Sequence, residues 1–196
     1  YRWTRMAQGL HMQRVVIDQD EERPLTGALN GKHDGGSHLI FGEGDLEAER
    51  ALSHRFGMII PKERIPRLLH ALSDNKSLVL DGEPIQASSR PVVPQGWIDD
   101  HGDGFRLRIV RDPTIDEVFR NGVVRCGDHL HAIGDGQLSR EQRKVLSRGI
   151  VYSLSDVGQL VSEALPRLQD KIPVHIKTKR LPTVNQSPPR LVLETK

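Results

Sequence analysis

Turn-forming residues interrupt this 196-residue chain at short intervals, and their spacing limits the elements that it can form. Asn-Gly pairs occur at 30–31 and 121–122, and the segments at 81–84 and 99–104 read DGEP and DDHGDG. Gly, Asn and Asp in such clusters favour tight turns between short strands. We therefore expect an α+β fold of mainly antiparallel β-strands and hairpins, with several short helices packed on them.

The segment FRLRIV, at 105–110, has a clear strand pattern. Its apolar residues alternate with Arg106 and Arg108, as the two faces of a half-buried strand require. The remaining β-branched or alternating segments predict strands at 10–18, 37–43, 122–126, 173–181 and 190–194, and a strand, turn and strand at 77–87.

Helices are expected where a capping residue precedes an apolar stripe. Asp45 precedes the segment 46–57, which Gly57 can end, and Pro66 fits the first turn of a helix at 65–72. Asp112-Pro113 has the same cap-and-proline order and predicts a short helix that Asn121-Gly122 closes. SREQ, at 139–142, has the form of a capping box, and an amphipathic stripe at 157–168 predicts a helix that Pro166 must end or kink.

A Pro- and Gly-rich stretch, SSRPVVPQGW at 88–97, disfavours a central strand and marks the expected boundary between subdomains. We expect an N-terminal α+β subdomain at 1–90 and a C-terminal α+β subdomain at 91–196, which can be continuous with the first.

Composition narrows the classes of protein that remain. Aromatic residues make up only 4% of the chain, so we expect a core of Val, Ile and Leu and no aromatic platform that stacks single-stranded bases. The single cysteine, Cys126, excludes an internal disulfide, indicates a reducing compartment and is expected to be a small buried residue. No apolar run approaches the ~18 residues that span a bilayer, so we expect a cytoplasmic protein with no membrane partner.

Two histidines one residue apart, in GDHLHAIGDGQ at 127–137, suggest a metal site. On a strand, His129 and His131 would share one face, as in the metal-binding cupin barrels that the pair superficially resembles. Those barrels add a glutamate and a further histidine, because a divalent ion needs three or four ligands. Here the nearest glutamate, Glu141, falls in an expected helix. We expect two turns around a short strand with the histidines on its wetter face, and no metal.

A second motif, GALNGKH at 27–33, is similar to a phosphate-binding loop but departs from its spacing. That loop needs four residues between its glycines and Ser or Thr after the lysine, whereas this chain has three and then His33. A hairpin turn at Asn30-Gly31 is the better interpretation, and we expect no nucleotide or other cofactor and no catalytic residue.

Basic residues gather toward the C-terminal end, although the formal net charge is only +2. If 173–181 is a strand, Lys177 and Lys179 share a face, with Arg180 adjacent and Lys171 upstream. This segment predicts weak, nonspecific contact with the phosphates of double-stranded DNA. The same residues are equally consistent with a solvated strand face or with a surface that faces a further domain.

The second half of the chain also carries motifs of a known family. The patterns DP-x-I-x-E-x-F-x-NG from residue 112, CGD-x-L from 126 and LP-x-L, IPV and LP between 165 and 182 lie within residues 77–194. This region resembles the segment before the motor in bacterial Swi/Snf-type helicase-like ATPases; residues 1–76 match more loosely.

The resemblance implies a parent protein that translocates on double-stranded DNA with ATP. The Walker lysine loop, the Mg²⁺ motif and the arginine finger would lie downstream of Lys196, so this part would neither bind nor hydrolyse nucleotide. Its expected role is a noncatalytic accessory module whose partners are the downstream ATPase motor of the same polypeptide and DNA. The alternative is a free-standing, cupin-like metal-dependent β-barrel enzyme that uses His129 and His131.

Overall fold

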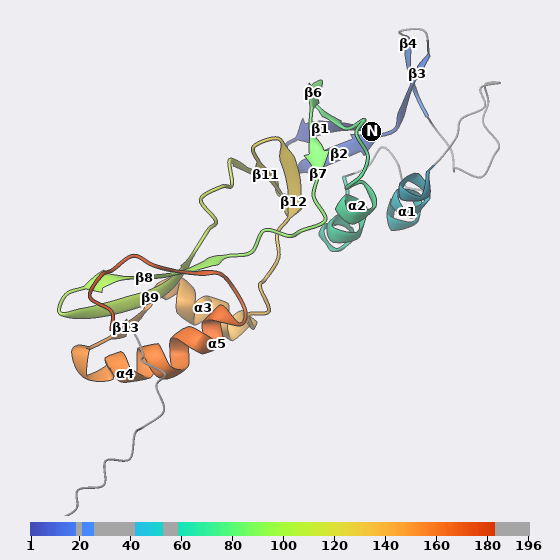
Figure 1. Ribbon diagram of the computed structural model, residues 1–196. Coiled ribbons are helices and arrows are strands. Elements are labelled where there is room, and N and C mark those ends of the chain that lie inside the picture. The colour runs from blue at the N-terminus through green and yellow to red at the C-terminus, as the bar shows by residue number, and fades with distance from the viewer. Residues whose placement is uncertain (19–20, 26–41, 53–58, 183–196) are drawn as a thin grey trace, which may run out of the picture. The chain divides into compact units, whose positions relative to one another are not determined.

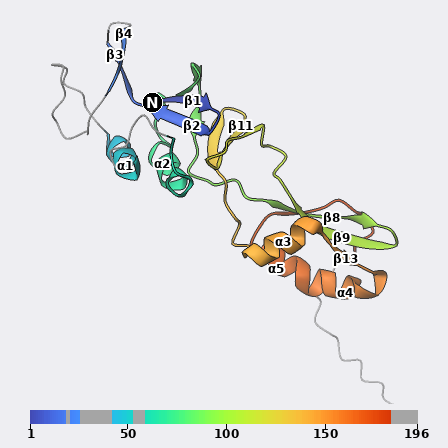
Figure 2. The same ribbon diagram turned by 180° about the vertical axis from the view of Figure 1, so that it is seen from behind.

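The computed structural model describes residues 1–18, 21–25, 42–52 and 59–182, and it consists of two compact units, which Figures 1 and 2 show from opposite sides. Unit 1 comprises Tyr1–Val93 and Arg111–Gly134, and unit 2 comprises Pro94–Val110 and the residues from Asp135 onward. The chain enters unit 2 inside the expected boundary at 88–97, but it does not stay there. Residues 111–134 return to unit 1, so each unit consists of two chain segments. This division differs from the expected one, in which each subdomain was a single segment, 1–90 or 91–196.

The described residues of unit 1 form two small sheets and one separate hairpin. The strand orders are β2-β1-β5-β6 and β10-β11-β12-β7, and the hairpin is β3-β4. The first sheet consists of β1 (Arg2–Met6), β2 (Gly9–Gln13), β5 (Val79–Leu80) and β6 (Glu83–Pro84). The second consists of β7 (Gln86–Ala87), β10 (Glu117–Val118), β11 (Val123–Cys126) and β12 (His129–Ala132), and the hairpin of β3 (Val15–Asp18) and β4 (Glu21–Pro24). Because β12 pairs with β7, residues 111–134 belong to unit 1.

The described part of unit 1 also has two helices, α1 (Glu43–Leu52) and α2 (Ile65–Ala71), and a short 3-10 turn, Lys62–Arg64, precedes α2. The expected stripe is confirmed, since Ile65, Leu68, Leu69 and Leu72 are buried and Pro66 lies in the first turn of α2. They pack with Trp3, Leu10 and Leu130 of the strands into one core. Helix α1 begins at Glu43, two residues before the expected cap Asp45.

Unit 2 is a four-stranded sheet with helices on one side. The strand order is β13-β9-β8-β14, built from β8 (Gln95–His101), β9 (Gly104–Val110), β13 (Ile150–Tyr152) and β14 (Val174–Ile176). Strands β8 and β9 form the long central hairpin, β13 pairs antiparallel with β9, and β14 pairs parallel with β8. The helices α3 (Arg140–Arg148), α4 (Val157–Gln159) and α5 (Leu165–Gln169) lie on the same side of β8 and β9 in both views (Figures 1 and 2).

The helices of unit 2 follow their local sequence signals. Ser139 and Gln142 form the expected capping box of α3, in which each side chain accepts the other residue's backbone N–H, at 3.1 and 3.0 Å. Pro166 does not end the last helix. A π-helical turn at Leu160–Ala164 joins α4 to α5, and the Leu165 N–H bonds the Leu160 carbonyl. This wider turn lies just before Pro166. Because proline has no N–H to donate, the regular hydrogen-bond pattern of the helix is interrupted there, but the helix continues.

The α+β, mainly antiparallel fold is confirmed, but the expected helix after Asp112-Pro113 and the full length of the expected strand at 173–181 are not. No helix follows Asp112-Pro113, because the Asp112 carboxylate accepts the backbone N–H and the hydroxyl of Thr114, at 2.9 and 2.6 Å. This side-chain turn competes with helix formation, and the chain continues into β10. The expected strand at 173–181 ends at Ile176. The expected features at 37–41, 190–194, Asn30-Gly31 and Gly57 lie outside the described residues.

Candidate nucleic-acid interface

The sheet of unit 2 has a second face, opposite its helices, that no helix or strand in the described part of the same unit covers. Side chains alternate along a strand, so Ile98 and Leu107 point to the helices and join the core of unit 2. Their neighbours point the other way. The strand register places these residues on one surface, which we call the Trp97 face: Trp97 and Asp99 of β8, Arg106 and Arg108 of β9, His175 of β14, and Lys177 just after it.

Two cations lie against the aromatic ring of Trp97. The Lys177 N–H donates to the Ile98 carbonyl at 2.8 Å, which holds the lysine beside β8, and its Nζ lies 4.7 Å from the ring centroid. The Arg108 guanidinium comes from the opposite neighbouring strand, with its central carbon 5.9 Å from the centroid. Cations over an indole are attracted by the negative face of the ring. Trp97 therefore orients positive charge on both of its flanks.

Asp99 fixes the two arginines of this face. Arg106 donates from Nε and an Nη atom to the two carboxylate oxygens at 3.1 and 3.2 Å, and Arg108 donates two bonds to one oxygen, at 3.1 and 2.8 Å. Burial disfavours the ionised carboxylate, but the bonds and charges of the two arginines outweigh it and lower the pKa of Asp99. Three cations then face one carboxylate, so the Trp97 face keeps a positive charge.

The structure separates the four basic residues that the sequence placed together. Lys177 lies on the Trp97 face, whereas Lys171 donates to Gln142 of helix α3 at 3.0 Å, on the side that the helices cover. Arg180 turns to the β8–β9 hairpin, where it pairs with Asp100 at 3.5 Å and donates to the Asp103 carbonyl at 3.0 Å. Lys179 is exposed, but β14 ends before it, so strand geometry does not align it with Lys177.

Sequence reasoning missed the aromatic centre of this surface. The alternation in FRLRIV correctly put Arg106 and Arg108 on the polar face of a strand. Trp97, however, ended the stretch that was interpreted as a boundary, and β8 begins two residues before it, at Gln95. The alternation of Gly96 and Ile98 with Trp97 and Asp99 was the available signal.

The two histidines occupy the expected position on a strand of unit 1. His129 and His131 lie on the more exposed face of β12, with their ring centroids 6.0 Å apart. The Nδ1 atom of His129 is 2.6 Å from the Asp128 carboxylate, and that of His131 is 2.9 Å from the Arg90 carbonyl. Among the described residues, no group of three or more His, Cys, Asp or Glu side chains is arranged to hold a metal ion. Cys126, on neighbouring β11, is half-buried rather than buried, and burial raises the pKa of its thiol.

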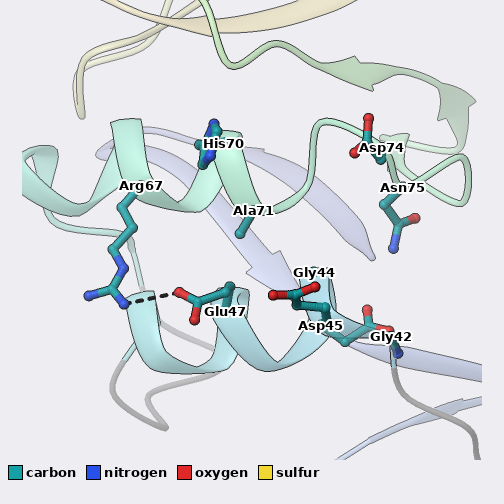
Figure 3. A pocket seen from close by; sticks show the side chains of 10 residues that line it. Gly42, Gly44, Asp45, Glu47, Arg67, His70, Ala71, Asp74 and Asn75 are labelled. Carbon is teal, nitrogen blue, oxygen red and sulfur yellow. Dashed lines mark hydrogen bonds and ion pairs between the residues drawn. The ribbon is translucent and has the colours of Figure 1, made fainter.

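A pocket of about 490 Å³ lies between α1 and α2 of unit 1 (Figure 3). Two of the acidic residues that line it, Asp45 and Glu47, already have partners within the protein. Glu47 pairs with Arg67 at 3.0 Å and with Arg50, and Asp45 accepts from the Tyr1 hydroxyl at 2.8 Å and from the Gly42 N–H at 2.9 Å. These two carboxylates are thus engaged within the protein, and we assign no ligand to the pocket.

The fold and its surface define an α+β protein with a basic sheet face centred on a tryptophan. No family model matches the chain, and neither the curated proteins nor the solved structures contain a match to it. Within the described ranges, no helix is both long and apolar enough to span a membrane.

Proposed function

We propose that this chain is a noncatalytic N-terminal accessory module of a Swi/Snf-type DNA-dependent ATPase, and that it contacts DNA through the Trp97 face. The motifs within residues 77–194 support the parentage. The observation that carries the DNA contact is the placement of Arg106, Arg108 and Lys177 on the sheet face of unit 2 opposite its helices, where they face the carboxylate of Asp99.

The predicted binding is electrostatic and weak. Each neutralised phosphate contributes about 0.9 to the negative slope of log affinity against log salt concentration, so engaging two or three phosphates gives a slope of roughly −2 to −3. No sequence preference is expected, because phosphate contacts carry no base information.

Charge substitutions on the two sides of the sheet test the location of this contact. Fluorescence anisotropy of a labelled duplex, at two salt concentrations, compares wild type with Lys177→Glu/Arg108→Gln and with Lys171→Glu. The double variant should weaken binding and reduce the salt slope by about 1 to 2, since it removes cations that reach phosphate. Lys171→Glu is the matched control, because Lys171 lies on the helix-covered side. Equal losses in both variants would remove the Trp97 face from the proposal.

The parentage has its own test in the coding sequence that follows Lys196. A Walker lysine loop and an arginine finger downstream would support the accessory role. A reading frame without any ATPase motif downstream would overturn this part of the proposal, even if the chain binds DNA.

A further inference from the structure

Trp97 has a position that phosphate binding alone does not require. Strands β9 and β14 flank β8 on its two sides. Since neighbouring strands lie about 4.8 Å apart, β9 and β14 are about 10 Å apart, with the tryptophan of β8 between them. Trp97 has Arg108 on β9 and His175 on β14 as register partners, and Lys177 follows two residues after His175. Because the Lys177 ammonium reaches the ring from just after β14 and the Arg108 guanidinium reaches it from β9, the face offers an indole ring with one cation from each neighbouring side.

The two cations differ in how firmly they are held. Bonds from Nε and an Nη atom to Asp99 fix the Arg108 guanidinium. Lys177 is exposed and follows the last residue of β14, and its ammonium lies over the ring. A lysine ammonium on a flexible stem exchanges partners easily, so Lys177 can leave the ring for a phosphate and uncover the indole.

An indole on a sheet face distinguishes single-stranded from double-stranded nucleic acid. In a duplex the bases are stacked on one another, and a flat protein surface reaches only phosphates and sugars. An unpaired strand can place a base on an aromatic side chain while cations in the same groove contact its backbone.

We propose that the Trp97 face binds unpaired single-stranded nucleic acid, with one base stacked on Trp97 and the flanking phosphates on Lys177 and Arg108. This inference rests on the proposed function, because it assigns the ligand of the same face. In this proposal, the tryptophan contributes to the affinity for single strands only, whereas the cations contribute to the affinity for both single strands and duplexes.

The other tryptophan of the chain makes the stacking directly measurable. Trp3 is 0% exposed in the core of unit 1, so a change of tryptophan emission on adding oligothymidylate reports on Trp97. Wild type should show quenching by the single strand. Trp97→Phe should retain affinity within a few-fold, because phenylalanine also stacks, and should lose most of the quenching.

The decisive comparison uses anisotropy with labelled oligothymidylate and a labelled duplex of the same length. We expect wild type to bind the single strand roughly tenfold more tightly than the duplex. Trp97→Ala should weaken single-strand binding roughly 10- to 100-fold, leave duplex binding within about twofold and leave the salt slope unchanged. Lys177→Glu should weaken both.

The outcomes separate this inference from the proposed function. If Trp97→Ala and Trp97→Phe both bind the single strand like wild type, while Lys177→Glu weakens binding, base stacking is excluded and the phosphate contact stands. If wild type binds duplex as tightly as single strand, the stated preference is also excluded. If neither form binds at low salt, the DNA contact and this inference fail together.

Discussion

Asp99 shows how one residue balances the charge of a whole surface. Its carboxylate accepts bonds from both Arg106 and Arg108, so it holds the arginines in place and also cancels part of their charge. The pKa of Asp99 is below its ordinary value of 3.8 in the folded protein, so folding favours the ionised form. That stabilisation is present above the ordinary pKa and is lost as the pH falls through the lower, folded-state value.

Asp99→Asn should therefore destabilise the protein at neutral pH, and the difference from wild type should shrink below about pH 4. Urea unfolding of both proteins across this range measures the difference in the free energy of unfolding. Asp103→Asn, at the turn of the same hairpin, controls for the removal of a negative charge. A difference between wild type and Asp99→Asn that does not change with pH would show that the effect is not electrostatic.

The histidine pair of β12 makes a prediction about metal content. His129→Ala/His131→Ala should leave both metal content and unfolding temperature close to wild type, because two imidazoles do not provide the three or four ligands of a tight site. Elemental analysis of the purified proteins measures the first quantity, and thermal unfolding measures the second. Stoichiometric zinc, iron or manganese in wild type that disappears in the double variant would favour the cupin-like enzyme instead.

At the scale of elements, strand β9 combines a structural face with a candidate binding face. Leu107 is 2% exposed in the core of unit 2, whereas the Arg106 side chain is 33% exposed. Leu107→Ala should cost about 2 to 5 kcal/mol of unfolding free energy, and Arg106→Ala less than about 1 kcal/mol. Denaturant unfolding monitored by circular dichroism compares them, and equal costs would contradict the assignment of the two faces.

Local patterns predicted the elements whose signals are contained within a few residues. The alternation of FRLRIV, the stripe of α2 and the capping box of α3 all depend on neighbours in sequence, and all three are confirmed. The prediction of a helix after Asp112-Pro113 was wrong, because an aspartate that can cap a helix can also form a side-chain turn. Here the Asp112 carboxylate accepts from Thr114 in such a turn.

The candidate site was harder to predict, because long-range pairing assembles it. Trp97 and His175 are register partners in two parallel strands, although they lie 78 positions apart in the sequence. Nothing in the local sequence of either segment predicts that the two strands pair. The proline and glycine residues before Trp97 also disfavour a strand, so the start of β8 was not predicted. Of the basic residues that the sequence placed together, Lys177 lies on the Trp97 face, whereas Lys171 bonds to Gln142 and Arg180 pairs with Asp100.

The residues that the structure describes form two hydrophobic cores, which share no residue. One gathers Trp3, Leu68 and Leu130 in unit 1, and the other gathers Ile98, Leu107 and Leu168 in unit 2. The chain crosses from unit to unit near residues 93, 110 and 134, so neither core is built from one continuous segment. Because regions with separate cores can open separately, each unit is expected to respond to loss of its own core contacts.

Matched core substitutions test this independence. Leu68 is 0% exposed, so Leu68→Ala should speed amide exchange in α2, β11 and β12 and leave β8, β9 and β14 near their wild-type rates. Leu107→Ala should do the reverse, because each substitution leaves a cavity in one core only. Hydrogen-exchange mass spectrometry resolves peptides from both units in one experiment. Faster exchange throughout both units from either substitution would instead show that the units unfold as one cooperative body, and the Trp97 face would then depend on the stability of unit 1.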